Sequence, residues 1–239
     1  MTQGETRNPE QPTKRHWGRV GLICLGGLAA TGFAGYKTAP FIGTVWRDDP
    51  TPLGHIVTGA LAPDFAVQGA DGKIHRLNDY RGKTVVLEWT SPICEFTASH
   101  YNSGNMQKLQ KYGADQGVIW LLVDSSAVGA PDYLSAAAAN RRIASKGISA
   151  TTLLIDSDGK VGLTYGAVTT PSVYVIDAAG HLRYQGAVDD NPWGSGTQDV
   201  AHSYLKQTLD ALAKGTAIAT LQSRPYGCSV KYGAGRRAV

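Results

Sequence analysis

The chain has 239 residues, of which 42% are hydrophobic and 18% charged, and its formal net charge is +4. This composition is typical of a globular protein and excludes disorder over the whole length. Lys and Arg are scattered without a basic stripe, which argues against nucleic acid as a partner. Three cysteines are too few for a disulfide scaffold.

An apolar run near the N-terminus is the first informative stretch. Residues 20–36 are uncharged, and they follow Lys14, Arg15 and Arg19. A positive flank before an apolar run is typical of a signal peptide or of a membrane anchor. A buried core helix is the alternative, which the glycines of this run disfavour. We therefore expect residues 1–36 to be a signal peptide or anchor. The rest of the chain is then exported or periplasmic, and an uncleaved segment at residues 20–36 would hold it at the inner membrane.

Proline and glycine interrupt residues 37–57, so we interpret this stretch as a linker. Residues 64–67 and 73–77 flank a glycine-rich turn and predict a hairpin. The mostly apolar residues 84–89 are typical of a buried strand. A helix is expected from Cys94 to Tyr101, followed by a break at residues 102–104.

The remaining pattern alternates between helix and strand. The expected helices are residues 105–112, 135–146 and 197–214, and the expected strands are residues 118–123, 151–155, 172–177 and 182–188. The last two strands predict a hairpin. This order predicts an α/β sandwich with a mixed sheet over residues 58–215, followed by a tail at residues 216–239.

Cys94 comes soon after the first buried strand and opens a predicted helix. The free N–H groups and the positive dipole end of a helix favour thiolate over thiol. The thiolate is the form that attacks disulfides or peroxides. We therefore expect the sulfur of Cys94 to be ionised and open to solvent. The alternative is a small buried hydrophobe, which is the commoner role of a lone cysteine.

Two further residues favour a reactive Cys94 over a buried structural one. Glu88 lies six residues before Cys94 inside an apolar strand, where burial would raise its pKa and allow proton exchange near neutral pH. A strand-end carboxylate that faces water is the alternative. Pro171, in Thr170-Pro171, precedes a strand, as expected of a residue that cannot donate to a ladder. Whether its peptide bond is cis stays open.

Together these features resemble the thioredoxin superfamily. Residues 62–190 are similar to bacterial redoxins grouped with alkyl-hydroperoxide-reductase/thiol-specific-antioxidant proteins, most specifically over residues 87–96 and 100–107. The resemblance implies a thioredoxin-like three-layer sandwich with a central mixed sheet, an N-terminal hairpin extension and a C-terminal tail. It also implies that Cys94 is the attacking thiol, that Pro171 is a cis-proline packed beside it, and that Glu88 is a buried proton-relay carboxylate.

The chain departs from both standard active sites of these proteins. Thr97 stands where thioredoxins carry the second cysteine of Cys-x-x-Cys. Peroxiredoxins carry Pro-x-x-x-Thr-x-x-Cys, and here Leu87 and Ser91 occupy the proline and threonine positions. Ser91 keeps a hydroxyl, but the activating arginine of peroxiredoxins has no evident counterpart.

Cys228 is a candidate for the missing resolving thiol, in what we expect to be a flexible tail without a core role. Its attack on an oxidised Cys94 would give an intrachain disulfide that an external thiol reductant could reopen. A structural disulfide and an unpaired tail cysteine are the alternatives. We interpret His100 as a histidine of the helix surface, and the acidic residues 156–158 as a turn rather than a calcium loop.

Three functions follow from this pattern. The leading one is an enzyme that exchanges protein thiols and disulfides through Cys94, with Glu88 as proton relay and Pro171 shaping the substrate groove. The second is a peroxidase in which Cys94 is oxidised, Cys228 resolves it, and Ser91 binds the peroxide. The third is a redox-silent binding module with a permanent Cys94–Cys228 disulfide. We expect no cofactor and no metal.

Overall fold

The computed structural model describes residues 56–193 and 202–236, all within the unit Asp48–Val239. The expected signal peptide or anchor at residues 1–36 and most of the linker lie outside the described residues. Within the described ranges, no helix is long and apolar enough to cross a membrane.

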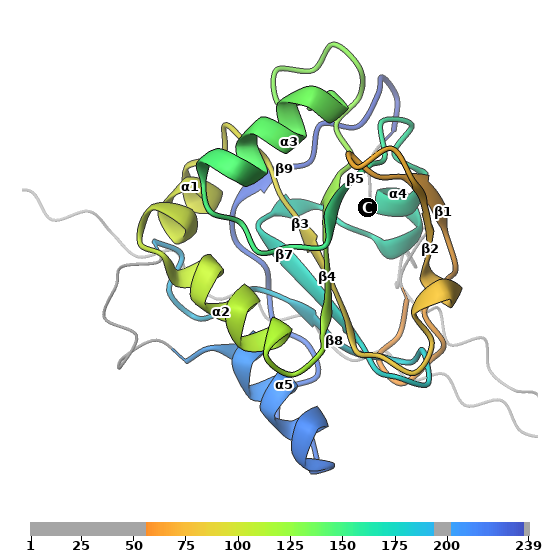
Figure 1. The fold of residues 1–239 in the computed structure, drawn as a ribbon, viewed down its shortest axis with the longest axis vertical. Helices are drawn as coiled ribbons and strands as arrows, with labels where there is room; N and C mark the ends of the chain where they lie inside the picture. Colours follow the sequence, from red (N-terminus) through yellow and green to blue (C-terminus); the bar gives the residue numbers. More distant parts are fainter. Residues whose placement is uncertain (1–55, 194–201, 237–239) are drawn as a thin grey trace, which may run out of the picture. The chain divides into compact units, whose positions relative to one another are not determined.

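A five-stranded sheet forms the centre of the fold (Figure 1). Its strands are β3 (Val85–Trp89), β4 (Ile119–Asp124), β5 (Thr152–Ile155), β7 (Ser172–Ile176) and β8 (Leu182–Gly186). They lie in the order β5-β4-β3-β7-β8, with β3, β4 and β5 parallel and β7 antiparallel to both of its neighbours. The predicted mixed sheet is therefore confirmed.

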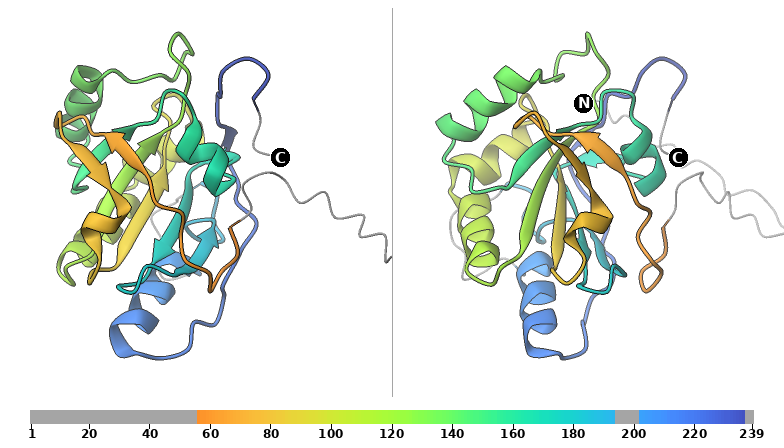
Figure 2. Two further views of the ribbon diagram at one scale, coloured as in Figure 1. Left: turned by 90° about the vertical axis from the view of Figure 1, so that its right-hand side faces the viewer. Right: turned by 45° about the vertical axis from the view of Figure 1, so that its right-hand side comes forward.

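The two faces of the sheet bury different residues because side chains alternate along a strand. Val86 points to one hydrophobic cluster, whereas Val85 and Leu87 point to the other. The first cluster is covered by α1 (Glu95–Asn102), α2 (Asn105–Ala114), α3 (Ala136–Ser145) and α5 (Tyr204–Lys214). The second is covered by the hairpin β1 (Ala66–Gln68) and β2 (Ile74–Arg76), the 3-10 helix η1 (Leu77–Tyr80) and α4 (Lys160–Tyr165). Figure 2 shows these layers, which confirm the three-layer sandwich.

The structure differs from the sequence-based elements in two helices. The short helix α4 was not predicted, because its six residues follow a turn and include Gly162. Helix α5 begins at Tyr204 rather than at residue 197: Ser203 has extended backbone angles, and its side chain accepts a hydrogen bond from the Lys206 N–H. Such a serine is a preferred residue at the start of a helix. Residues 194–201 lie outside the described part.

Residues 216–236, here called the C-terminal segment, pack against the domain. The N–H of Ser223 donates to Gln185 O on β8 at 3.1 Å. Further on, β9 (Cys228–Ser229) pairs antiparallel with β6 (Thr169–Thr170), and Lys231 O accepts from the Ala127 N–H at 2.9 Å. Figure 2 shows this segment running from α5 back along the domain. The expectation of a flexible tail is therefore wrong, although none of residues 216–236 is fully buried in the core.

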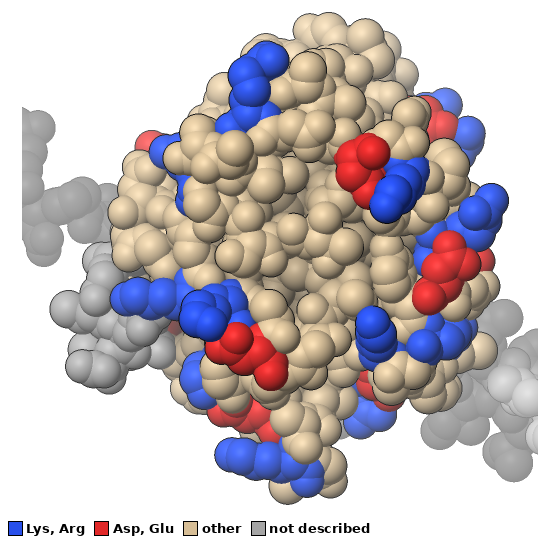
Figure 3. Space-filling view, in the orientation of Figure 1, with Lys and Arg blue, Asp and Glu red and all other residues tan. Residues whose placement is uncertain are grey.

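Charged side chains of both signs lie around the margin of the face in Figure 3, and most of its centre is uncharged. Several charges form exposed pairs of opposite sign, such as Lys111–Asp115 at 3.0 Å and Lys206–Asp210 at 2.9 Å. Exposed pairs contribute little to stability, so the fold depends on its two apolar clusters.

Candidate functional site

Cys94 is the residue that precedes the first turn of α1, as the sequence predicts. Its backbone is extended, with φ −75° and ψ 120°, and its carbonyl accepts the Ala98 N–H at 2.8 Å. The chain thus passes from β3 through a short loop directly into the helix. The N–H groups of the first turn of α1 lie at the end that carries the sulfur, which is the electrostatic setting for a stabilised thiolate.

Cys94 and Cys228 form a disulfide, with Cα atoms 5.7 Å apart across a sequence separation of 134 residues. The alternative of an unpaired tail cysteine is therefore wrong. Cys94 is only 1% exposed, whereas Cys228 is partly exposed. The expectation of a solvent-open sulfur at position 94 does not hold in this oxidised state, because β9 and the Thr170 carbonyl cover that sulfur.

Pro171 lies between β6 and β7, and the Thr170–Pro171 peptide bond is cis. The carbonyl oxygen of Thr170 lies 3.0 Å from the sulfur of Cys94. The C-terminal segment passes close to the same peptide: a Cβ atom on Gly227 would lie 2.0 Å from Thr170 O. Since Gly227 also has φ +129°, the approach of Cys228 to the proline requires glycine at this position.

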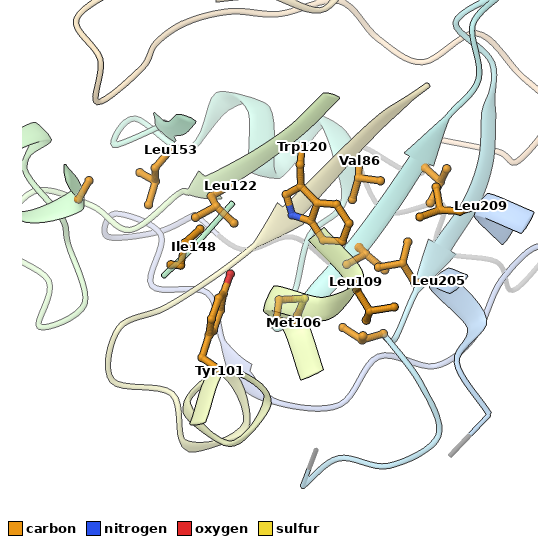
Figure 4. Packing of buried hydrophobic residues seen from close by; sticks show 14 of the residues in the cluster. Val86, Tyr101, Met106, Leu109, Trp120, Leu122, Ile148, Leu153, Leu205 and Leu209 are labelled. Carbon is orange, nitrogen blue, oxygen red and sulfur yellow. The ribbon is translucent and has the colours of Figure 1, made fainter. Parts of the chain in front are cut away.

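Glu88 is completely buried, so the alternative of a water-facing strand-end carboxylate is wrong. Its carboxylate accepts hydrogen bonds from Tyr101 Oη at 2.8 Å, Trp120 Nε1 at 2.8 Å and Gln110 Nε2 at 3.3 Å. Figure 4 shows Tyr101 and Trp120 among the buried side chains of the first hydrophobic cluster. Burial raises the pKa of Glu88 from 4.5 to about 7, and the three donors offset part of that rise. We call these four residues the acid cluster.

Ser91 and Thr97, three residues before and after Cys94, are both buried but have different surroundings. Ser91 Oγ donates to Asp132 Oδ2 at 3.3 Å. Thr97 Oγ1 makes no hydrogen bond within the described part of the chain. The hydroxyl that the sequence marks as a candidate peroxide ligand is therefore held by a carboxylate.

His100 is completely buried, so its assignment to the helix surface is wrong. Its Nε2 lies 2.8 Å from Tyr226 Oη, which belongs to the C-terminal segment. Burial lowers the pKa of His100, and the Asp189 carboxylate, 3.9 Å from Nε2, offsets part of this. Nothing in the helical pattern indicated this partner, because 126 residues separate the two side chains.

A cavity of about 270 Å³ lies close to the cis-proline. It is bordered by Val168 and Ser172, on either side of Pro171, by Tyr174 on β7, and by Ser223 and Pro225 of the C-terminal segment. Among the described residues, no group of three or more His, Cys, Asp or Glu side chains is arranged to hold a metal ion.

A cysteine at the start of a helix, joined in a disulfide beside a cis-proline on a mixed sheet, defines a class of enzyme: the thioredoxin-fold thiol–disulfide oxidoreductases. Within that class, residues 58–185 match the AhpC/TSA family, and the chain belongs to this family.

Curated relatives agree with this class. The thiol:disulfide interchange protein DsbE of Escherichia coli K12 is 26% identical over 174 residues, covering 67% of this chain and 82% of the relative. The thiol-disulfide oxidoreductase ResA of Geobacillus thermodenitrificans is 31% identical over 144 residues, covering 59% of this chain and 75% of the relative.

Solved structures extend the likeness over more of the chain. A hypothetical protein of Sinorhizobium meliloti 1021 is similar with a TM-score of 0.67 and 26% identity, covering 76% of this chain and 98% of that one. An uncharacterized conserved protein of Geobacillus kaustophilus also has a TM-score of 0.67, at 24% identity, with 75% and 94% covered. These likenesses support the fold rather than a substrate.

Proposed function

We propose that the chain is an exported enzyme that exchanges protein thiols and disulfides through the Cys94–Cys228 couple. The observation that carries the proposal is the disulfide between the cysteine at the start of α1 and a cysteine on a strand packed beside Pro171. Cys228 thereby supplies the second thiol that Thr97 does not. The two cysteines are 134 residues apart in the sequence.

The proposed exchange has two steps, which conserve atoms and electrons. In the reduced enzyme, the Cys94 thiolate attacks a substrate disulfide; one substrate sulfur leaves as a thiolate and the other joins Cys94 in a mixed disulfide. Cys228 then attacks Cys94, forms the intrachain disulfide and releases the second substrate thiol. The substrate is reduced, the enzyme is oxidised, and an external thiol reductant reopens the Cys94–Cys228 bond.

Glu88 is the proposed store for the proton that each exchange step moves. Its pKa of about 7 allows the carboxyl to gain or lose a proton near neutral pH. The hydroxyl of Tyr101, on the helix that Cys94 opens, donates to this carboxylate. A change of charge at Glu88 therefore alters a hydrogen bond of Tyr101 on α1, the helix that Cys94 precedes.

Pro171 and the cavity of about 270 Å³ form the proposed substrate groove. Tyr174 and Pro225 give this cavity aromatic and apolar walls, which suit a side chain of a polypeptide. The peroxidase alternative requires Ser91 to bind peroxide, whereas its hydroxyl is held by Asp132. This contact favours exchange with disulfides over peroxide reduction.

Export is supported by the basic residues before the apolar run at residues 20–36. It is also supported by the disulfide, because such bonds persist in oxidising compartments outside the cytoplasm. We propose that residues 1–36 direct the chain across the inner membrane or hold it there.

The test is redox titration of the full chain, with mass spectrometry after thiol alkylation. We expect Cys94 and Cys228 to be reduced together in a glutathione buffer, and the reduced enzyme to reduce a protein disulfide with loss of activity in Cys94→Ser. A disulfide that resists every reductant while the chain stays folded would support a structural role instead. Stoichiometric reaction with hydrogen peroxide, without turnover of disulfides, would support the peroxidase.

A further inference from the structure

Four buried or half-buried polar side chains form a cluster that the exchange steps above do not use. They are His100 on α1, Asn105 at the start of α2, Asp189 beyond β8, and Tyr226 on the C-terminal segment. His100 is 0% and Asp189 3% exposed, so their hydrogen bonds cannot be exchanged freely for bonds to water. We call this group the polar ring.

The donors and acceptors of the polar ring match one another around a closed circuit. Tyr226 Oη donates to Asp189 Oδ1 at 2.7 Å and accepts from His100 Nε2 at 2.8 Å. The amide nitrogen of Asn105 donates to Asp189 Oδ2 at 3.1 Å and to His100 Nδ1 at 2.8 Å. This pattern requires a neutral His100 that carries its proton on Nε2. The phenol hydroxyl is the part of the circuit that belongs to the C-terminal segment.

The polar ring joins the two halves of the redox couple. Tyr226 lies two residues before Cys228, and His100 lies six residues after Cys94 on the helix that Cys94 opens. The aromatic rings of Tyr226 and His100 stack with an interplanar angle of 7° and centroids 6.0 Å apart. Within the described ranges, Tyr226 alone makes a hydrogen bond from the C-terminal segment to α1. The other bonds of that segment reach α5, β6, β8 and neighbouring loops.

We propose that Tyr226, docked in the polar ring, is a positioning residue that keeps Cys228 opposite Cys94 while the disulfide is open. The proposal rests on the proposed exchange function and adds to it the device that makes a distant cysteine an efficient second thiol. Two thiols joined only by a long flexible loop meet at a low effective concentration. A docked segment raises that concentration because the ordering is already present before the bond forms.

The variant Tyr226→Phe tests this with the smallest change. It removes one hydroxyl, so the buried His100 Nε2 loses its acceptor and Asp189 Oδ1 loses one of its donors, and the end of the segment moves to admit water. The readout is the equilibrium constant for forming the Cys94–Cys228 disulfide from the two thiols with oxidised glutathione. It is measured on the full chain by alkylation and mass spectrometry. We expect this constant to fall at least about tenfold in Tyr226→Phe.

Tyr80→Phe is the matched control. Tyr80 also bonds a histidine, with its hydroxyl 2.5 Å from His75 Nδ1, but it lies on η1, and its hydroxyl makes no hydrogen bond to the described part of the C-terminal segment. We expect the constant of this control to stay within about twofold of wild type, since the redox pair is undisturbed.

A second pair of variants separates positioning from general destabilisation. His100→Gln restores an N–H donor near the position of Nε2, whereas His100→Leu does not. We expect the glutathione constant of His100→Gln to lie nearer to wild type than that of His100→Leu. This comparison remains decisive if Tyr226→Phe does not fold.

An unchanged constant in Tyr226→Phe, or equal constants in the two His100 variants, would overturn the positioning role and leave the exchange function standing. A wild-type disulfide that never equilibrates with glutathione would instead overturn the exchange function, and the positioning role with it.

Discussion

His100 and Tyr101 are neighbours on α1, yet they belong to two different buried polar groups. Tyr101 donates to Glu88 within the acid cluster, whose members come from β3, α1, α2 and β4. His100 bonds Tyr226 within the polar ring, which reaches the C-terminal segment. Neighbouring residues of α1 thus contact the core of the domain, through Tyr101, and the C-terminal segment, through His100.

The two groups differ in whether they titrate. Burial brings the pKa of Glu88 to about 7, so the acid cluster changes charge near neutral pH. In the polar ring, burial lowers the pKa of His100, while burial and the Asp189 carboxylate raise the pKa of Tyr226 above its ordinary value of 10.0. The polar ring therefore keeps its protons over the range in which Glu88 gains or loses one. On the roles proposed above, the acid cluster stores a proton and the polar ring positions Cys228.

The largest effect is expected at the two sulfurs themselves. Cys228→Ser should stop the second step, so that a mixed disulfide between Cys94 and substrate accumulates and turnover ceases. Mass spectrometry of the trapped complex measures this. In the same variant, loss of a cross-link over 134 residues should lower the free energy of unfolding by about 5 kcal/mol, measured by urea denaturation. Full turnover by Cys228→Ser would remove Cys228 from the reaction.

A smaller effect tests position without changing a polar side chain. Gly227→Ala places a Cβ 2.0 Å from Thr170 O, so the strand carrying Cys228 must move; the glutathione constant should fall by about tenfold or more. Gly235→Ala is the matched control, because Gly235 also has a positive φ, of +78°, but open space around it. The control should cost only about 1–2 kcal/mol of stability and leave the constant unchanged. Equal constants in the two variants would contradict the close packing at Gly227.

The acid cluster is tested by pH. Because the pKa of Glu88 is raised in the folded chain, its contribution to stability is full below about pH 4.5 and is lost as the pH rises through about 7. Glu88→Gln removes this loss. The free energy of unfolding of Glu88→Gln, relative to wild type, should therefore increase by about 3 kcal/mol between about pH 4 and about pH 8. Denaturant titrations across this range measure the difference.

Glu95→Gln is the control for that series, since Glu95 is an exposed carboxylate at the start of α1. Its free energy of unfolding, relative to wild type, is measured over the same pH range as the baseline for the Glu88→Gln series. A flat difference for Glu88→Gln would mean that the pKa of Glu88 is not raised in the folded chain. The division between a titrating group and a positioning group would then fail.

The sequence predicts the central strands and the start of α1 because these signals are local. Apolar runs bounded by turn residues mark β3, β4 and β7, and Cys94, Glu88 and Pro171 lie at fixed offsets from them. The three donors around Glu88 are harder to predict, because Tyr101, Gln110 and Trp120 look like ordinary core or helix residues in the sequence.

The polar ring could not be predicted from the sequence. His100 and Tyr226 are 126 residues apart, and the path of the C-terminal segment depends on contacts such as that of Ser223 with Gln185. A glycine-rich tail carries no periodic apolar pattern, so its packing depends on hydrogen bonds that become visible only once the domain has folded. The nearest sequence signal was Tyr226-Gly227-Cys228, where an aromatic residue and a glycine precede the cysteine.

The smallest expected effect concerns Ser91, which belongs to neither buried group. Ser91→Ala removes a hydrogen bond of 3.3 Å to Asp132, which should cost about 1 kcal/mol of stability and change the rate of disulfide exchange less than about twofold. Stopped-flow measurement of exchange, paired with a peroxide-consumption assay, gives both quantities. A large loss of peroxide reactivity with exchange intact would show that Ser91 leaves Asp132 to bind peroxide. The protein would then contain a second reaction at Cys94, beyond the functions of the acid cluster and the polar ring.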